Sequence, residues 1–183
     1  MSKLIIFNKP FGVLSQFSDS KGRETLAQFI QIPNVYPIGR LDKNSEGLLL
    51  LTDDGALNNS IAHPNKKIWK TYIVQIEGDP SDYQLSPLKK GVMLKDGLTL
   101  PAKYKKIKIP SISERLPPVR YRKNIPTSWL EIQIYEGRNR QIRRMTALLG
   151  FPTLRLIRKK IGPWSINSID PGRYKEIKVN KLK

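Results

Sequence analysis

The sequence predicts an α+β fold, with an antiparallel or mixed sheet and few helices. Residues 70–77 and 128–135 alternate in side-chain character with a period of two, which is typical of strands. Two shorter runs, LIIF at residues 4–7 and LLLL at residues 48–51, are continuously apolar, as buried strands are. Only a few segments combine helical spacing with a capping residue. Many strands and few helices favour the α+β class.

In the first half of the chain, each expected element ends at a turn signal. The strand at residues 4–7 ends in the turn NKPFG at residues 8–12. Thr25 is expected to cap a short helix, and a loop at residues 38–42 precedes the strand at residues 47–51. Asp54 can cap a helix through Ala62, with Leu57 and Ile61 spaced i, i+4 on one face.

The second half alternates strands with two further helices. Ser81 is expected to cap a helix ending near Gly91, and Asn139 to cap one that Gly150 closes. Residues 101–126 carry five prolines and many cations, which predicts a basic strand followed by an irregular loop. That loop is either a solvated linker or an RNA contact, and its basic neighbours favour the second. Short strands are expected near residues 154–158 and 174–179.

The charge balance concerns partners rather than fold. The chain has 33 Lys and Arg against 15 Asp and Glu, a net charge of +18, which favours a polyanion such as RNA, DNA or an acidic membrane. We expect no membrane partner, because the longest apolar runs fall far short of the roughly 20 residues that cross a bilayer. With no Cys and one His, a Cys nucleophile and a Cys/His zinc site are excluded. No cofactor or metal motif is present.

Two groups of residues are candidates for function. Residues 137–169 contain no acidic residue and eight cations, which predicts a phosphate-binding surface; they are Arg138, Arg140, Arg143, Arg144, Arg155, Arg158, Lys159 and Lys160. Asp42 is either a turn aspartate bonded to its own backbone or a nucleophile or base on a loop before a buried strand. Tyr72 is either an aromatic of a packed strand face or a site residue.

Four segments together resemble the pseudouridine synthases, in the branch that modifies ribosomal RNA. They are NKPFGV at residues 8–13, GRLDKNSEGLLLLT at 39–52, KTY at 70–72 and EGRNRQIRRM at 136–145. The second and fourth are long and specific, and the resemblance covers nearly the whole chain. Residues 125–130 and 151–158 are most similar to the members that act on the large subunit.

The resemblance implies a fold and an activity. The fold is a mixed, largely antiparallel sheet in two lobes with a central cleft. Residues 1–183 would form a single catalytic domain, without the separate N-terminal S4-type RNA-binding module of many relatives. The activity is the isomerisation of a specific uridine to pseudouridine in 23S ribosomal RNA. We expect a cytoplasmic monomer with ribosomal RNA as its partner and no cofactor.

The resemblance also assigns residues. Asp42 matches the catalytic carboxylate, Arg143 its basic partner, and Tyr72 the tyrosine near the base. Arg40 is expected to help the target uridine leave its stack, which costs a few kcal/mol. The predicted contacts to the RNA backbone are Lys9, Lys70, Arg138, Arg140 and Arg144.

Two other classes of protein remain open on sequence alone. A non-catalytic RNA-binding protein would explain the charge equally well, but it would have no use for an acid among the cations. A DNA-binding protein could use the segment 138–150 as a recognition helix, although no helix-turn pairing precedes it.

Overall fold

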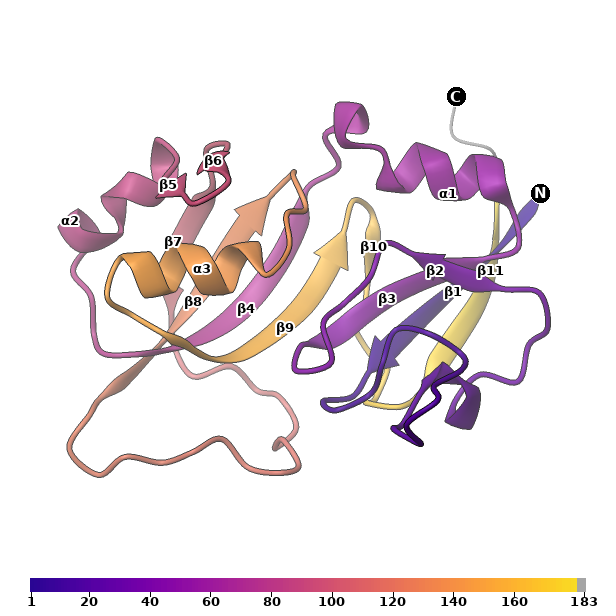
Figure 1. Cartoon of the computed structure of the whole chain (residues 1–183), viewed down its shortest axis with the longest axis horizontal. Helices are drawn as coiled ribbons and strands as arrows, with labels where there is room; N and C mark the ends of the chain where they lie inside the picture. The colour runs from indigo at the N-terminus through magenta and orange to yellow at the C-terminus, as the bar shows by residue number, and fades with distance from the viewer. Residues whose placement is uncertain (181–183) are drawn as a thin grey trace. The chain divides into compact units, whose positions relative to one another are not determined.

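The computed structural model describes residues 1–180, with Pro64 described by its backbone only (Figure 1). The chain divides into two compact units. Unit 1 comprises Met1–Ile68 and the chain from Arg158 onward, and unit 2 comprises Trp69–Ile157. Strand β9 (Thr153–Ile161) contributes residues to both units.

The sheet of unit 1 is built around β1 (Ser2–Lys9). This strand pairs antiparallel with β3 (Glu46–Thr52) on one side and with β11 (Tyr174–Val179) on the other. β2 (Tyr36–Ile38) pairs antiparallel with β3, and β10 (Trp164–Ser165) with β9. One helix, α1 (Gly55–Ala62), and the 3-10 turns η1 (Leu26–Gln28) and η2 (Pro64–Lys66) complete the unit.

Both faces of this sheet are covered, which explains why its strands are continuously apolar. Leu48 and Leu50 of β3 pack in a cluster with Leu57 and Ile61 of α1. The alternate residues of β1 and β3 pack on the other face with Leu26 and residues of the segment 13–41. Asp54 caps α1, as predicted, by accepting from two backbone amides at 2.8 and 3.1 Å.

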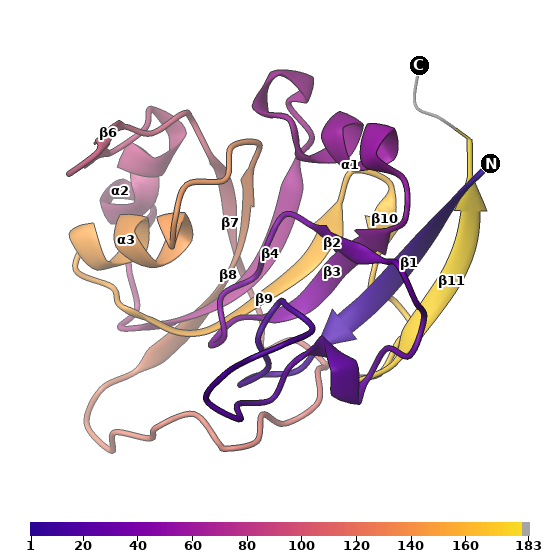
Figure 2. The ribbon, with the colours of Figure 1, turned by 45° about the vertical axis from the view of Figure 1, so that its right-hand side comes forward.

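Unit 2 has an antiparallel sheet with helices on one face. β8 (Thr127–Ile134) pairs with β4 (Lys70–Glu77) and with β7 (Lys103–Ile107). The helices α2 (Asp82–Leu85), η3 (Ser86–Lys89) and α3 (Gln141–Leu148) send apolar side chains into one cluster with β4 and β8. A hairpin of β5 (Met93–Leu94) and β6 (Gly97–Leu98) lies beside α2 and α3 (Figures 1 and 2).

The predicted α+β class and the largely antiparallel sheet are confirmed. The strands predicted at residues 70–77 and 128–135 are β4 and β8, shifted by at most one residue. The predicted cap at Asn139 is wrong, because Arg140 precedes α3 in a left-handed conformation with φ of 46° and no side-chain cap. No helix of residues 1–180 is both long and apolar enough to cross a membrane.

Candidate active site

The Asp42 loop, residues 39–45, joins β2 to β3 in unit 1. Gly39 lies in the left-handed region with φ of +64°, which favours glycine. Leu41 is buried, and its backbone is held at both ends by Ser15: the Leu41 amide donates to Oγ at 3.1 Å, and Oγ donates to the Leu41 carbonyl at 2.7 Å. The Ser45 amide donates to the Asp42 carbonyl at 3.0 Å. These contacts fix the backbone on both sides of the half-buried Asp42.

Lys9 lies under this loop, with none of its surface exposed. Its Nζ donates to the carbonyls of Pro10 and Val13, each at 2.8 Å, and to that of Lys43 at 3.4 Å. Burial lowers the pKa of Lys9 to about 7, although the nearby carboxylates of Glu46 and Asp42 act in the opposite direction. The structure therefore leaves no surface of Lys9 for the predicted phosphate contact, and gives it the role of joining two loops.

Arg158 is a second buried cation of unit 1, with 4% of its surface exposed. Its Nε donates to the Leu48 carbonyl at 2.8 Å, while Nη2 has no hydrogen-bond partner among the described residues. Its charge lowers the pKa of Lys9. Lys9 thus lies within electrostatic reach of two carboxylates, Asp42 and Glu46, and of a second cation, Arg158.

Arg40 is exposed on the same loop. Its Nη2 donates to Oε1 of Gln16 at 3.1 Å, which directs the guanidinium along the surface of unit 1. An exposed guanidinium two residues from a carboxylate suits contact with a polyanion, because its planar fork matches phosphate oxygens.

Tyr72 and Lys70 lie on β4 in unit 2. Tyr72 is 8% exposed, stands opposite Ile132 of β8, and belongs to the core cluster of the unit. Its ring therefore packs on the strand face, as the simpler interpretation of the sequence predicted. Lys70 is half-buried at the start of the strand.

The basic face of α3 divides into two kinds of arginine. Arg140, in the left-handed residue before the helix, is exposed, and Arg143 is half-buried with Nη1 at 3.4 Å from the Thr153 carbonyl. Arg138 and Arg144 are held by acids. Arg144 donates to both oxygens of Asp96, at 2.7 and 3.1 Å, and this contact lowers the pKa of Asp96.

Arg138 fastens the β8–α3 connection to the β5–β6 hairpin. It donates to Oε2 of Glu136 at 3.1 Å and to the carbonyls of Gly97 and Leu98 at 3.0 and 2.5 Å. Oε1 of Glu136 also accepts from the Gln141 amide group at 2.5 Å. Arg138 and Arg144 therefore hold local structure, and the side chain of Arg140 is exposed.

The predicted phosphate surface at residues 137–169 requires a further correction. Arg155 is 7% exposed and donates to the Ser113 carbonyl at 2.9 Å, and Arg158 is buried as described. Strand alternation explains the burial of Arg158, since residues 154, 156 and 158 share one face and the first two are leucines, but it does not explain the burial of Arg155 on the opposite face. Sequence reasoning missed the buried role of Arg158, although this alternation was readable.

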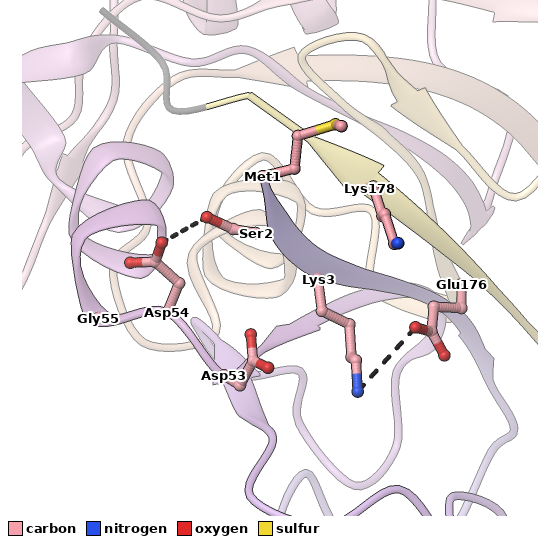
Figure 3. Close-up of a pocket in the computed structure, with 8 residues that line it drawn as sticks. All are labelled: Met1, Ser2, Lys3, Asp53, Asp54, Gly55, Glu176 and Lys178. Atoms are coloured by element: carbon pink, nitrogen blue, oxygen red, sulfur yellow. Dashed lines mark hydrogen bonds and ion pairs between the residues drawn. The ribbon is translucent and has the colours of Figure 1, made fainter.

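A hollow of about 530 Å³ in unit 1 offers a contrast (Figure 3). Its lining contains none of the predicted site residues and brings together Asp53, Asp54 and Glu176 with two lysines. Asp54 accepts a hydrogen bond from Ser2, and Glu176 lies 4.0 Å from the Lys3 ammonium. Three carboxylates disfavour a nucleic-acid ligand here.

The predicted residues thus fall into two groups. Lys9, Arg40 and Asp42 lie in unit 1, while Lys70, Tyr72 and the arginines of residues 138–144 lie in unit 2. Among the described residues, no three or more His, Cys, Asp or Glu side chains lie close enough together to hold a metal ion, and this includes the carboxylates of the hollow.

Comparison with known proteins supplies the remaining evidence. A family model described as RNA pseudouridylate synthase matches residues 3–148. Ribosomal large subunit pseudouridine synthase E of Vibrio vulnificus is 56% identical over 97% of this chain and 76% of its own length. The protein of the same name from Xanthomonas campestris is 55% identical over 94% of each. A crystal structure of a pseudouridylate synthase matches 97% of this chain and 71% of its own, with a TM-score of 0.78 and 29% identity.

Proposed function

We propose a target for this chain, which belongs to the RNA pseudouridylate synthase family: a specific uridine of large-subunit (23S) ribosomal RNA, which it isomerises to pseudouridine. The names of its relatives from Vibrio vulnificus and Xanthomonas campestris support this substrate. The net charge of +18 supports a large polyanion as the partner.

The reaction is an internal rearrangement. The bond between N1 of uracil and C1′ of the ribose breaks, the base turns, and C5 bonds to C1′. C5 then loses its proton while N1 gains one, so atoms and electrons balance without an outside reagent. The reaction needs an ionised carboxylate beside the sugar and base, and we assign this role to Asp42.

The observation that carries the proposal is the setting of Asp42. Its half-buried side chain projects from a loop whose backbone is held by Ser15 and by the buried Lys9. Such fixing lowers the cost of bringing a carboxylate to a reacting atom, because little motion remains to be lost. A protein that only bound RNA would gain nothing from an acid at this position, since it repels phosphate.

We further propose roles for three residues. Arg143 is the basic partner of Asp42 and orients its carboxylate for the reaction. Tyr72 stacks beside the target base and is a candidate for removing the C5 proton. Arg40 fills the space or holds the phosphate when the uridine leaves its stack.

The protein is proposed to act as a monomer in the cytoplasm, as a single catalytic domain composed of both units. The large positive net charge supports the monomer, since repulsion between two copies opposes self-association.

Pseudouridine mapping tests the function. Transcribed 23S ribosomal RNA and isolated large subunits are treated with the parent protein, with Asp42→Asn and with the control Asp53→Asn, and then mapped by carbodiimide primer extension. Asp53 is an exposed acid of the same unit, outside the proposed site. We expect a new stop with the parent and the control, and a rate reduced at least about a thousandfold for Asp42→Asn.

Two results would contradict the proposal. Equal modification by Asp42→Asn and the parent would remove Asp42 from the chemistry. If the parent binds both substrates tightly and modifies neither, the protein is an RNA-binding protein without this activity.

A further inference from the structure

The longest loop of unit 2, residues 108–126 between β7 and β8, contains a second hollow. Its volume is about 480 Å³, within the range of about 300–1,000 Å³ that small-ligand sites occupy. Residues 119–127 and Gln75 of β4 line it. In Figures 1 and 2, the loop extends beyond the end of the β7–β8 pair, away from the β5–β6 hairpin.

The loop is held to the end of β4 by two of the residues that line the hollow. The Gly78 amide donates to the Pro126 carbonyl at 2.7 Å, and Arg122 lies 3.1 Å from Oε1 of Glu77. Earlier in the loop, Arg115 donates to the carbonyls of Pro117 and Pro118, at 2.8 and 2.9 Å. A ligand that binds here finds a loop already folded, so less binding energy is lost in ordering it.

The charge of the hollow has one sign. Residues 115–130 contain no acidic residue and four cations: Arg115, Arg120, Arg122 and Lys123. Arg120 and Lys123 are exposed, whereas Glu77 partly neutralises Arg122. This composition favours an anionic ligand.

Tyr121 makes the hollow more specific than a basic surface. Its side chain is 83% exposed and lies between Arg120 and Arg122 in the sequence. An exposed aromatic ring among cations is the arrangement by which proteins bind single-stranded nucleic acid, with a base on the ring and phosphates on the cations. An acidic peptide would use the cations but would gain little from the ring.

We propose that this hollow binds an unpaired nucleotide of the RNA, with its base stacked on Tyr121 and the adjacent phosphates held by Arg120 and Lys123. The inference rests on the proposed function, because it takes the RNA substrate as the ligand. It adds a contact outside the proposed catalytic residues, and it selects for substrates that carry a single-stranded segment.

The chain offers a matched control for the test. Tyr83 of α2 is 87% exposed, but it follows Asp82, has no cation beside it in the sequence, and does not line the hollow. Tyr121→Ala, Tyr121→Phe, Arg120→Gln and Tyr83→Ala are compared with the parent. The first readout is fluorescence anisotropy with a short, labelled, uridine-rich single strand and with its duplex. The second is kcat and KM for pseudouridine formation in 23S ribosomal RNA.

We expect Tyr121→Ala to bind the single strand roughly 5- to 150-fold more weakly, the range for loss of one base stack. Its loss in modification should appear in KM rather than in kcat, and Tyr121→Phe should recover most of it. Arg120→Gln should reduce the slope of log affinity against log salt by about 0.7 for each lost phosphate contact. Tyr83→Ala should match the parent in both readouts.

Equal affinities of Tyr121→Ala and Tyr83→Ala for the single strand would overturn the proposal, and so would a loss confined to the duplex. Failure of the proposed function is distinguishable, because the parent would then modify no ribosomal RNA while the anisotropy comparison still reports on the hollow.

Discussion

Replacing Lys9 by methionine tests how the base of the Asp42 loop is held. In the folded chain, burial lowers the pKa of Lys9 to about 7 from the usual 10.5. Because the unfolded chain then binds more protons between these two values, the free energy of unfolding of the parent should rise with pH across this window. The neutral amine keeps two N–H donors, enough for the Pro10 and Val13 carbonyls at 2.8 Å.

The magnitude follows from the same two pKa values. One pKa unit corresponds to about 1.4 kcal/mol, so the parent should gain about 2 kcal/mol between pH 7 and pH 9. Lys9→Met cannot show this gain, because methionine does not titrate. Urea unfolding at both pH values, followed by circular dichroism, measures the difference. Lys3→Met is the control, since Lys3 lies on the same strand, is about one-third exposed and only weakly paired with Glu176.

If the free energies of unfolding of the parent and of Lys9→Met differ by the same amount at pH 7 and at pH 9, the reasoning is refuted. It would mean that the three carbonyls keep the ammonium charged and outweigh burial. Binding of RNA provides a second check. Because Lys9 has no exposed surface, Lys9→Met should keep the salt dependence of the parent, whereas loss of a phosphate contact lowers the slope by about 0.7 to 0.9.

Two further predictions concern unit 2. Gly91 has a φ of +93°, and a Cβ there would lie 2.2 Å from the Thr99 carbonyl oxygen, so Gly91→Ala should lower the free energy of unfolding by roughly 3 kcal/mol in urea titrations; an unchanged midpoint would contradict this geometry. Arg144 lowers the pKa of Asp96, so that ion pair contributes stability above pH 4 that disappears as pH falls through the lowered pKa. In thermal unfolding, the parent should therefore be more stable than Asp96→Asn near neutral pH but not in acid. A higher stability of the parent that persists in acid would contradict this prediction.

Local rules predicted the elements that carry a strong local signal. Residues 70–77 and 128–135 alternate over a full strand, and Asp54 has the geometry of a cap followed by Leu57 and Ile61. The β5–β6 hairpin was missed, because two-residue strands have no period to detect. The start of α3 was misplaced because no capping side chain precedes it. Instead, Oε1 of Gln141, the first residue of the helix, accepts from the Arg138 amide at 3.1 Å.

The candidate site was predicted less completely, because local sequence patterns do not show which side chains are buried or reactive. Asp42, Tyr72 and Arg143 came from resemblance to the family, because nothing local distinguishes them from a turn acid, a packed aromatic and one arginine among many. Lys9, which lies in the matched segment 8–13, was expected to contact the RNA backbone. Strand alternation places it on the face of Ile5 and Phe7, and all three side chains are fully buried.

This error changes where the RNA contacts are expected. The +18 charge counts every cation equally, but Lys9 and Arg158 are buried, and Arg138 and Arg144 are bound to Glu136 and Asp96. The charge available to phosphate around α3 is therefore smaller than the sequence suggests. The exposed cations of residues 119–127 have fewer acidic partners, and they accompany an exposed ring. Substrate affinity should therefore depend more on the loop of Tyr121 than on Arg138 or Arg144, a difference that composition alone does not predict.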